Sequence, residues 1–394
     1  MKKGGYWLLV ISMVNSLVLM GLTSTTAAKE EIFKFGINLP HTGDAAWIGE
    51  AFNRGIDLAL DEINAKGGID GIKLRAIKED SKALPREGAT SMIKLATLDK
   101  VPFVITVMAA ITLACQPIAA ENKVLMIELG ASSSELLNKP YLYAISVSNV
   151  YMMSCFGTWL WERGYRNAAT LVLSDSHGRD TAATFAKKWS QLGGTMVAQE
   201  EYARGDVVFS AQIVKVKAAN PDVVMGNATG KSSALLIKQM RELGLTPKAL
   251  HTNGKWDPGA LNEAREASIG VMAIDFMLDP EAQCARDFVK AYRQRYGKDP
   301  SWQEANGYEA IYILAELIKR VKAKGGNYHS GEQLRDALEG KREFSSVYAE
   351  KIKFGDDHSV LKPIWIVETI AFDPHKYKIN KVFSIEEIMK YRLR

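Results

Sequence analysis

The chain has 394 residues, which is too long for one ordinary hydrophobic core and predicts two domains of similar size. Hydrophobic residues make up 47% of it and charged residues 24%, so the composition is that of a globular protein and excludes a disordered one. The net charge of +5 is spread along the sequence without a basic block, so we expect no nucleic acid partner.

The first 28 residues have the pattern of an export signal. Lys2 and Lys3 precede the apolar stretch WLLVISMVNSLVLMGL, and small residues follow it, with Thr26 and Ala28 placed for cleavage before Lys29. The alternative is an uncleaved membrane anchor, but polar residues interrupt the apolar run, which is short for a membrane span. We therefore expect a cleaved signal peptide (1–28) and a periplasmic mature protein.

Strands and helices alternate regularly in the next part of the chain. Apolar residues that recur every three or four positions predict helices, and unbroken apolar runs predict the strands of a parallel sheet covered on both faces. Gly67 and Gly68 are placed to end the first helix, and Pro85 stands where a helix tolerates proline, in its first turn. The predicted order is strand 32–39, helix 48–66, strand 71–80, helix 85–99, strand 101–108, helix 111–122 and strand 124–129.

The same alternation then begins again, which indicates a second unit of the same kind. Its predicted elements are helix 154–164, strand 167–174, helix 179–193, strand 195–202, helix 209–219, strand 221–227, helix 230–244, strand 248–253 and strand 270–276. The fold class that we predict is therefore α/β, with two doubly wound parallel-sheet lobes.

The last part of the chain changes character. Three helices follow one another at 281–297, 302–323 and 330–340, and a strand-rich tail follows at 351–372. Helices placed after a finished sheet are explained if the chain crosses back to cover the first sheet, with the tail returning to the second. Several crossings make a hinge between lobes that close over a ligand. We predict one lobe from residues 29–147 and 278–348, and the other from residues 148–277 and 349–394.

No catalytic or metal-binding constellation stands out. The sequence GNATGKSS lacks the upstream glycine of a phosphate-binding loop, no dinucleotide fingerprint follows a strand, and the six histidines are scattered. The three cysteines, Cys115, Cys155 and Cys284, fit no metal pattern; one pair could form a disulfide, or all three could be buried thiols. We expect no enzymatic activity, no cofactor and no metal.

Loops that follow the predicted strands are the natural place for a ligand, because ligands of open parallel sheets bind outside the carboxyl ends of the strands. These loops are rich in small and hydroxyl residues, which let backbone amides approach a ligand but are also ordinary turn formers. The six loops read PHTGDAAW, TVMAAIT, ELGASSSEL, SDSHGRD, GNATGKSS and TNGKWDPG.

Residues 36–80 resemble the opening of the leucine/isoleucine/valine-binding proteins of bacterial ABC importers. The telling parts are Thr42-Gly43, Gly49, the sequence INAKGGIDGIKL and Asp80, and the later segment DVVFSAQIVKVKAANPDVV also resembles the family's second lobe. The resemblance implies the type I periplasmic binding protein fold, with two lobes, three crossovers, a ligand between the lobes and delivery to a membrane permease. We expect a monomer.

The resemblance also implies ligand-binding residues in the first lobe. Trp47 matches the position of an aromatic wall against the ligand, although a tryptophan there could instead pack in the core. The grip on a ligand carboxylate falls on Ala109 or Ala110, Gly130 and Ser132. Ala109 and Ala110 have no hydroxyl, so they would act through backbone amides. Ser132 could instead cap a helix, and Ser133 or Ser134 could take its place at the ligand after a small shift.

In the second lobe the match is looser. The family's tyrosine after the first strand falls on His177, which could donate to a ligand or simply be exposed. Asn227 and its neighbour Thr229 are further polar candidates, and Phe276 is a candidate apolar wall that could equally be core, as are Trp256 and Met108.

The family's acidic partner for a ligand ammonium should fall in TNGKW, which has no acid. Lys255 lies there instead, either in the site or on the solvated surface, and it repels an ammonium group. A carboxylic acid without an ammonium, aliphatic or aromatic, therefore fits better than an α-amino acid, unless Asp257 or Asp275 supplies the charge after a small shift.

The sequence thus predicts an exported solute-binding protein of an ABC importer, which captures an amino acid or a small organic or aromatic acid by lobe closure. The alternative is the periplasmic ligand-sensing component of a signalling receptor, because that class shares this fold. An enzyme on a doubly wound fold is the third reading, and the absence of a catalytic set in the sequence argues against it.

Overall fold

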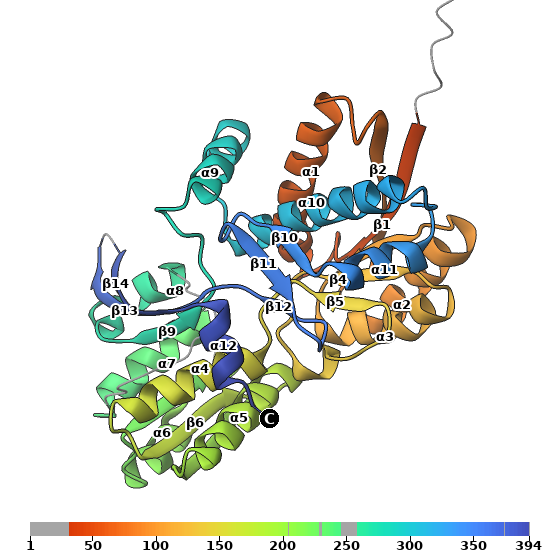
Figure 1. The fold of residues 1–394 in the computed structure, drawn as a ribbon. Coiled ribbons are helices and arrows are strands. Elements are labelled where there is room, and N and C mark those ends of the chain that lie inside the picture. The colour runs from red at the N-terminus through yellow and green to blue at the C-terminus, as the bar shows by residue number, and fades with distance from the viewer. Residues whose placement is uncertain (1–30, 204, 228–230, 246–257, 374, 394) are drawn as a thin grey trace, which may run out of the picture.

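The computed structural model describes residues 31–203, 205–227, 231–245, 258–373 and 375–393. The predicted signal peptide and the predicted strand 248–253 lie outside these ranges. Within them, two groups of strands and helices occupy opposite ends of an elongated molecule, with the C-terminal segments running between them (Figure 1).

The first sheet has five parallel strands in the order β2-β1-β3-β4-β5. Its strands are apolar and almost entirely buried where they lie centrally, as the unbroken apolar runs predicted. The strands are β1 (Glu31–Leu39), β2 (Ile72–Asp80), β3 (Phe103–Thr106), β4 (Leu125–Glu128) and β5 (Leu142–Ala144). The helices are α1 (Ala46–Ala65), α2 (Pro85–Ile93) and α3 (Ala109–Glu121). α2 continues as a short π-helix (Lys94–Leu98), and a 3₁₀ turn, η2 (Ser134–Leu136), follows β4.

The connection from α1 to β2 explains the sequence INAKGGIDGIKL. The side chain of Asn64 donates to the carbonyl of Leu74 and accepts from its amide, both at 2.9 Å, and so binds the end of α1 to β2. Gly68 has a φ of +80°, and a Cβ there would lie 2.2 Å from the carbonyl oxygen of Ile72. This part of the sequence that carries the family resemblance therefore builds the connection between α1 and β2.

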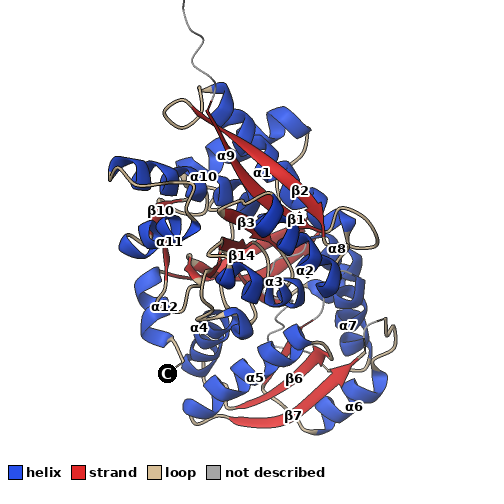
Figure 2. Cartoon of the chain, turned by 90° about the vertical axis from the view of Figure 1, so that its right-hand side faces the viewer, coloured by secondary structure: helices blue, strands red, loops and turns tan. Residues whose placement is uncertain are grey.

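The second unit has a parallel sheet in the order β7-β6-β8 and a separate antiparallel sheet in the order β14-β13-β9. The strands are β6 (Asn167–Leu173), β7 (Thr195–Tyr202), β8 (Val223–Asn227), β9 (Met272–Asp275), β13 (Ile364–Phe372) and β14 (His375–Phe383). The helices are α4 (Asn149–Glu162), α5 (Ser176–Gln191), α6 (Ser210–Ala218), α7 (Lys231–Glu242), α8 (Pro258–Ala264), followed by the 3₁₀ turn η3 (Arg265–Ser268), and α12 (Ile385–Tyr391). Figure 2 shows β6 and β7 with α5 and α6 at one end of the molecule.

The three late helices return to the first unit. They are α9 (Gln283–Tyr296), α10 (Trp302–Ala323) and α11 (Gly331–Gly340). α11 packs against β4, and both α10 and α9 pack on α1. α10 packs directly along α1: a Cβ on Gly55 would lie 1.9 Å from the carbonyl oxygen of Glu304, and one on Gly307 would lie 2.4 Å from that of Phe52. Glycine is thus required for the backbones of the two helices to approach this closely.

The tail returns to the second unit, as predicted, but its strands are antiparallel. β13 pairs with β9 and with β14, while α12 packs on α4 and the carbonyl of Tyr391 accepts from the Lys188 ammonium at 2.9 Å. On the way, β10 (Glu343–Ser345), β11 (Lys351–Phe354) and β12 (Val360–Leu361) form a small antiparallel sheet. β10 precedes residue 348 in the sequence and β11 follows it, and the two strands pair with each other. We predicted a lobe boundary after residue 348, and that boundary stays a prediction.

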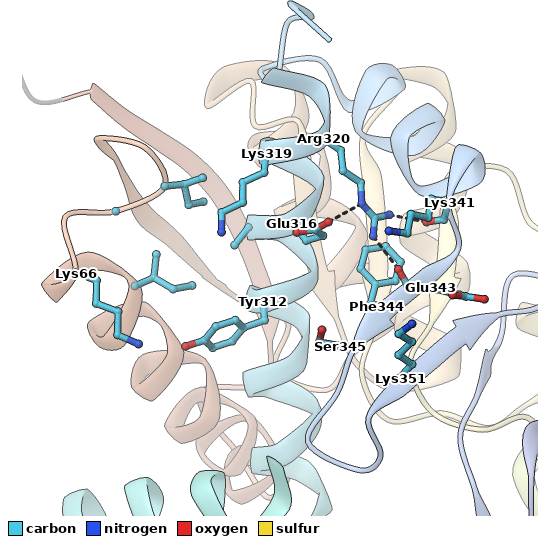
Figure 3. A pocket seen from close by; sticks show the side chains of 14 residues that line it. Lys66, Tyr312, Glu316, Lys319, Arg320, Lys341, Glu343, Phe344, Ser345 and Lys351 are labelled. Carbon is cyan, nitrogen blue, oxygen red and sulfur yellow. Dashed lines mark hydrogen bonds and ion pairs between the residues drawn. The ribbon is translucent and has the colours of Figure 1, made fainter. Parts of the chain in front are cut away.

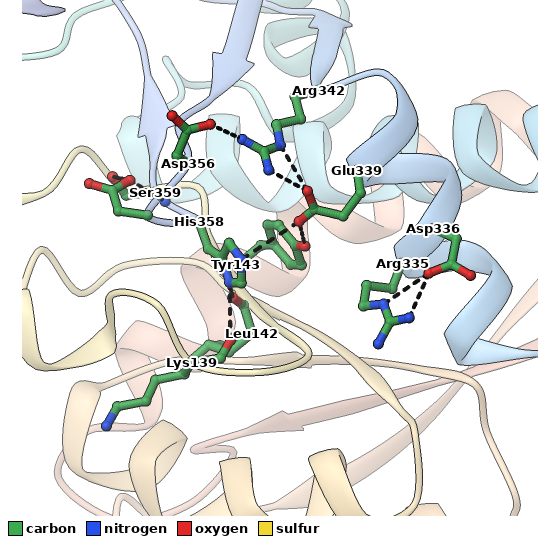
Figure 4. A network of polar contacts seen from close by, with 11 residues as sticks. Lys139, Leu142, Tyr143, Arg335, Asp336, Glu339, Arg342, Asp356, His358 and Ser359 are labelled. Carbon is green, nitrogen blue, oxygen red and sulfur yellow. Dashed lines mark hydrogen bonds and ion pairs between the residues drawn. The ribbon is translucent and has the colours of Figure 1, made fainter.

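The chain passes between the two units three times, at 145–148, 276–282 and 362–363. The segments beside the first and third passages are bound together: the amide of Ala144, at the end of β5, donates to the carbonyl of His358, before β12, at 3.0 Å. Figure 4 shows the network that holds His358 there, with Nδ1 at 3.1 Å from the carbonyl oxygens of Lys139 and Leu142 and the ring stacked on Tyr143 at 4.4 Å. The segments that adjoin the first and third passages are therefore held together.

A buried ion pair supports the same region. Lys362, on the third passage, has its ammonium 2.6 Å from Glu309 Oε2 on α10 and 2.9 Å from Asn306 Oδ1, and its side chain is fully buried. The ammonium also lies 3.9 Å from the centre of the Tyr348 ring. Burial lowers the pKa of Lys362, while the carboxylate of Glu309 acts in the opposite direction.

All three cysteines are free thiols in the structure, which answers the question the sequence left open. Cys115 and Cys155 are buried and Cys284 is partly exposed. Burial raises the pKa of Cys115 to about 12, against the effect of a hydrogen bond from Asn38. Over the ranges that the structure describes, no helix has the length and apolar character needed to cross a membrane.

Candidate ligand-binding site

The first side of the candidate site is the edge of the first sheet where the parallel strands β1, β3 and β4 end. The loop after β1 is held by Asp80, which accepts hydrogen bonds from the amide of His41 at 2.8 Å and from Thr42 Oγ1 at 2.5 Å. Burial would raise the pKa of Asp80, but the hydrogen bonds from Thr42, His41 and Lys82 outweigh it and lower that pKa to about 2. Asp80 is thus an ionised brace of this loop.

Trp47 is the second residue of α1 and is 59% exposed. The first turn of α1 lies on the backbone of the preceding loop, since a Cβ on Gly49 would be 1.9 Å from the carbonyl oxygen of Pro40. Asn53 Nδ2 donates to the carbonyl of Gly49 at 2.8 Å and fixes this turn. The structure therefore excludes the alternative of a core tryptophan and presents the indole at the sheet edge; contact with a ligand stays a prediction.

Ala109 and Ala110 form the start of α3, at the same edge of the first sheet as Trp47. No side chain caps this helix, and its N-cap residue Met108 has a φ of +70°, which is unusual for a residue with a side chain. The carbonyl of Met108 accepts from the amides of Ile111 and Thr112, both at 3.0 Å. The first amides of a helix point outward along its axis, and with the helix dipole they favour an anion at this end.

Gly130 and Ser132 lie in the loop after β4, where other partners engage their backbone groups, and their contact with a ligand stays a prediction. The amide of Gly130 donates to Glu128 Oε2 at 2.9 Å, and the same carboxylate accepts from the amide of Ala131 at 2.7 Å. A ligand carboxylate would have to displace Glu128 to reach that amide. Ser132 is 3% exposed, and its carbonyl accepts from the amide of Asn149 at 2.8 Å. It is Ser133, not Ser132, whose side chain caps the short helix that follows.

In the second unit, His177 and Asn227 lie at the ends of neighbouring strands β6 and β8. His177 is the second residue of α5, whose N-cap is Asp175, and it is partly buried. Asn227 is 1% exposed; its Nδ2 lies 3.2 Å from Thr181 Oγ1 and its carbonyl accepts from the hydroxyl of Tyr202 at 2.9 Å. In this conformation Asn227 therefore joins β8 to α5 inside the second unit.

Asp180 on α5 joins the two units directly. Its carboxylate accepts from the amide of Ser134 at 3.1 Å, from the Ser134 hydroxyl, and from Asn149 Nδ2 at 2.7 Å. Ser134 belongs to the loop after β4 and Asp180 to the helix that begins beside His177. The contact therefore brings the Ser132 loop and the His177 helix together. A cavity of about 340 Å³ lies beside this contact and borders Ser134 and Asp180.

The remaining predicted residues are not at this edge or cannot be placed. The ring of Phe276 is 1% exposed and packs edge-on against Trp302 and Tyr348, with centroids 6.4 and 5.9 Å away, so in this conformation it is part of the hinge core. Asp275 accepts from the amide of Phe276 at 2.7 Å. Thr229, Lys255, Trp256 and Asp257 lie outside the described residues.

Sequence reasoning missed Glu128 and Asp180. Glu128 is fully buried at the end of an otherwise apolar strand, and an acidic residue in that position is itself an available signal. The sequence carries no such signal for Asp180, because a single acidic residue near the start of a helix usually stabilises the N-terminus of that helix. Its bridging role depends on Ser134 and Asn149, which are 46 and 31 residues away in the sequence.

A family model described as "Periplasmic binding protein" matches residues 33–373. Among curated proteins, Leu/Ile/Val-binding protein homolog 1 of Brucella abortus (strain 2308) is 28% identical over 321 residues, which are 80% of this chain and 84% of that protein. Two solved structures illustrate the likeness of fold. The isoleucine complex of the LivJ substrate-binding protein from Streptococcus pneumoniae has a TM-score of 0.74 at 22% identity, covering 89% of this chain and 99% of that one. A solute-binding protein of R. palustris in complex with benzoate has the same TM-score and identity, covering 89% and 96%.

Proposed function

This chain belongs to the family of periplasmic binding proteins, and we propose that it captures a small carboxylic acid between its two lobes and delivers it to the membrane permease of an ABC importer. The observation that carries the proposal is the Asp180 contact, which sets the second unit's α5 against the loop after β4. The lobes in this proposal are residues 29–147 with 278–348, and 148–277 with 349–394. We also propose export with cleavage before Lys29, which N-terminal sequencing of the secreted protein tests.

A carboxylate suits the first-lobe edge on electrostatic grounds. The uncapped start of α3 offers outward backbone amides at Ala109 and Ala110 together with the positive end of the helix dipole. The exposed indole of Trp47 supplies a flat apolar wall for the body of the ligand. Two solved structures with this fold also contain a ligand that carries a carboxylate, isoleucine in one and benzoate in the other.

An acid without an ammonium group is favoured over an α-amino acid. The buried carboxylate of Glu128 accepts from the amides of Gly130 and Ala131, and Asp275 accepts from the amide of Phe276. Each of these acids is thus engaged by its own backbone. A ligand ammonium that paired with either of them would have to share a carboxylate that already accepts from backbone amides.

The test is a melting-temperature screen of the mature protein against amino acids, aliphatic acids and aromatic acids, followed by calorimetric titration of the acids that stabilise it. We expect benzoate-type or short aliphatic acids to raise the melting temperature and leucine and isoleucine to leave it unchanged. Trp47→Ala should weaken binding of the best acid by about tenfold or more, and Trp47→Phe, which keeps an aromatic wall, should recover most of it. If only amino acids raised the melting temperature, the proposed ligand class would be wrong. If both Trp47 variants bound the acid as tightly as the wild-type protein does, Trp47 would not belong to the site.

A further inference from the structure

A cavity of about 580 Å³ lies far from the candidate ligand site, at the other end of α1. It is enclosed by the C-terminal part of α1 and the turn after it, by α10, and by β10 and β11 (Figure 3). Because α1 has 20 residues and begins beside Trp47, the cavity lies roughly 30 Å from the sheet edge described above. A ligand in this cavity would not be in contact with the interlobe ligand.

One wall of the cavity is fixed by Arg320. Its Nε donates to Glu316 Oε1 at 2.9 Å, its Nη2 donates to the carbonyl of Glu343 at 2.7 Å, and its Nη1 donates to the carbonyl of Lys341. The guanidinium also lies over the ring of Phe344 at 4.3 Å. Arg320 therefore joins α10 to β10 and neutralises Glu316. Its guanidinium is engaged by these structural contacts.

Four lysines of the lining differ from Arg320, because they do not join structural elements in this way. Lys66 comes from the end of α1, Lys319 from α10, Lys341 from the residue after α11 and Lys351 from β11. All four are exposed, and within the parts of the chain that the structure describes no ion pair links any of them to a carboxylate. The lining holds these four ammonium groups and Arg320 against the carboxylates of Glu316 and Glu343, and this excess of positive charge favours a bound anion with several charges.

The floor of the cavity is apolar. Ile63, Ile69 and Phe344 are 8%, 2% and 4% exposed, and the hydroxyl of Tyr312 donates to Glu62 Oε2 at 2.7 Å. Figure 3 shows Lys66 and Lys319 on one side of this floor and Lys341 and Lys351 on the other. A ligand with charge on two sides and a compact body fits this arrangement better than a single carboxylate does.

We propose that this cavity is a second binding site, selective for a small oxyanion that carries two or more negative charges, such as a diphosphate or a polycarboxylate. The ammonium groups of Lys66, Lys319, Lys341 and Lys351 donate charge-assisted hydrogen bonds to its oxygens. Their origin on four separate segments means that the bound anion also ties α1, α10 and the β10–β11 sheet together.

Calorimetric titration of the mature protein with inorganic pyrophosphate, citrate and acetate tests the site. We expect saturable binding of pyrophosphate or citrate with a Kd below about 1 mM, no measurable binding of acetate, and weaker binding as ionic strength rises. The double variant Lys319→Ala with Lys351→Ala should weaken binding by about tenfold or more. The control, Lys290→Ala with Lys298→Ala, removes the same charge from exposed lysines elsewhere and should leave binding within about twofold.

Trp47→Ala should also leave pyrophosphate binding intact, which separates this site from the interlobe ligand. Melting temperatures of both lysine double variants confirm that they are folded. Absence of saturable binding to the wild-type protein would overturn the proposal, as would equal weakening by the two double variants, because that result would show a response to net charge alone.

Discussion

Replacing Lys362 by methionine tests whether the buried ion pair at the hinge is as tightly coupled as its geometry indicates. Lys362→Met keeps the length of the side chain but leaves the 2%-exposed Glu309 carboxylate without its cation. Removing one partner of a buried pair typically costs about 3–5 kcal/mol. We expect about 3 kcal/mol, the lower end, because the Ser346 hydroxyl and the Val347 amide still donate to Glu309.

The converse change, Glu309→Gln, should cost a similar amount, because it removes the negative charge beside the ammonium and leaves it with neutral neighbours such as Asn306 Oδ1 and the Tyr348 ring. The double variant should lose only about 1–2 kcal/mol, so the coupling energy should exceed about 2 kcal/mol. Urea unfolding followed by circular dichroism measures all four proteins of the cycle. Lys381→Met, which breaks the partly exposed pair with Glu387, is the control and should cost less than about 1 kcal/mol. Additive single effects, or a Lys362→Met loss as small as the control's, would refute the reasoning.

Two further predictions concern the first lobe. Asp80 has its pKa lowered from 3.8 to about 2, so its contribution to stability is complete above pH 3.8 and is lost as the pH falls towards about 2. Asp80→Asn should therefore lower the free energy of unfolding at neutral pH by about 1 kcal/mol, because solvent screens part of the interaction of this partly exposed carboxylate, and should flatten the acid limb of a stability–pH curve; an unchanged acid limb would show that Asp80 is not a brace. Gly55→Ala should lower stability by about 1–3 kcal/mol or more, because the new Cβ would lie 1.9 Å from the Glu304 carbonyl oxygen. Gly340→Ala, with no atom within 4 Å of its Cβ, should have little effect in the same thermal unfolding assay, and similar losses for both would contradict the α1–α10 argument.

The sequence by itself determined the order of most elements and the parallel sheet of the first unit. The spacing of apolar residues predicted α10 at 302–323, and α10 is Trp302–Ala323 in the structure. Gly67 and Gly68, predicted to stop α1, adopt the left-handed conformation with φ of +94° and +80°. These features depend on residues within a few positions of one another, so the local pattern is sufficient to predict them.

Only the tertiary structure decided which groups at the candidate site are available. The amide of Gly130 is engaged by Glu128, and Phe276 is enclosed by Trp302 and Tyr348. Asp180 reaches Ser134 across 46 residues of sequence. In the tail, β13 pairs antiparallel with β9 and with β14, although its apolar pattern resembles that of the parallel strands. Hydrogen-bond partners and pairing direction are set by contacts between distant segments, which no local periodicity records.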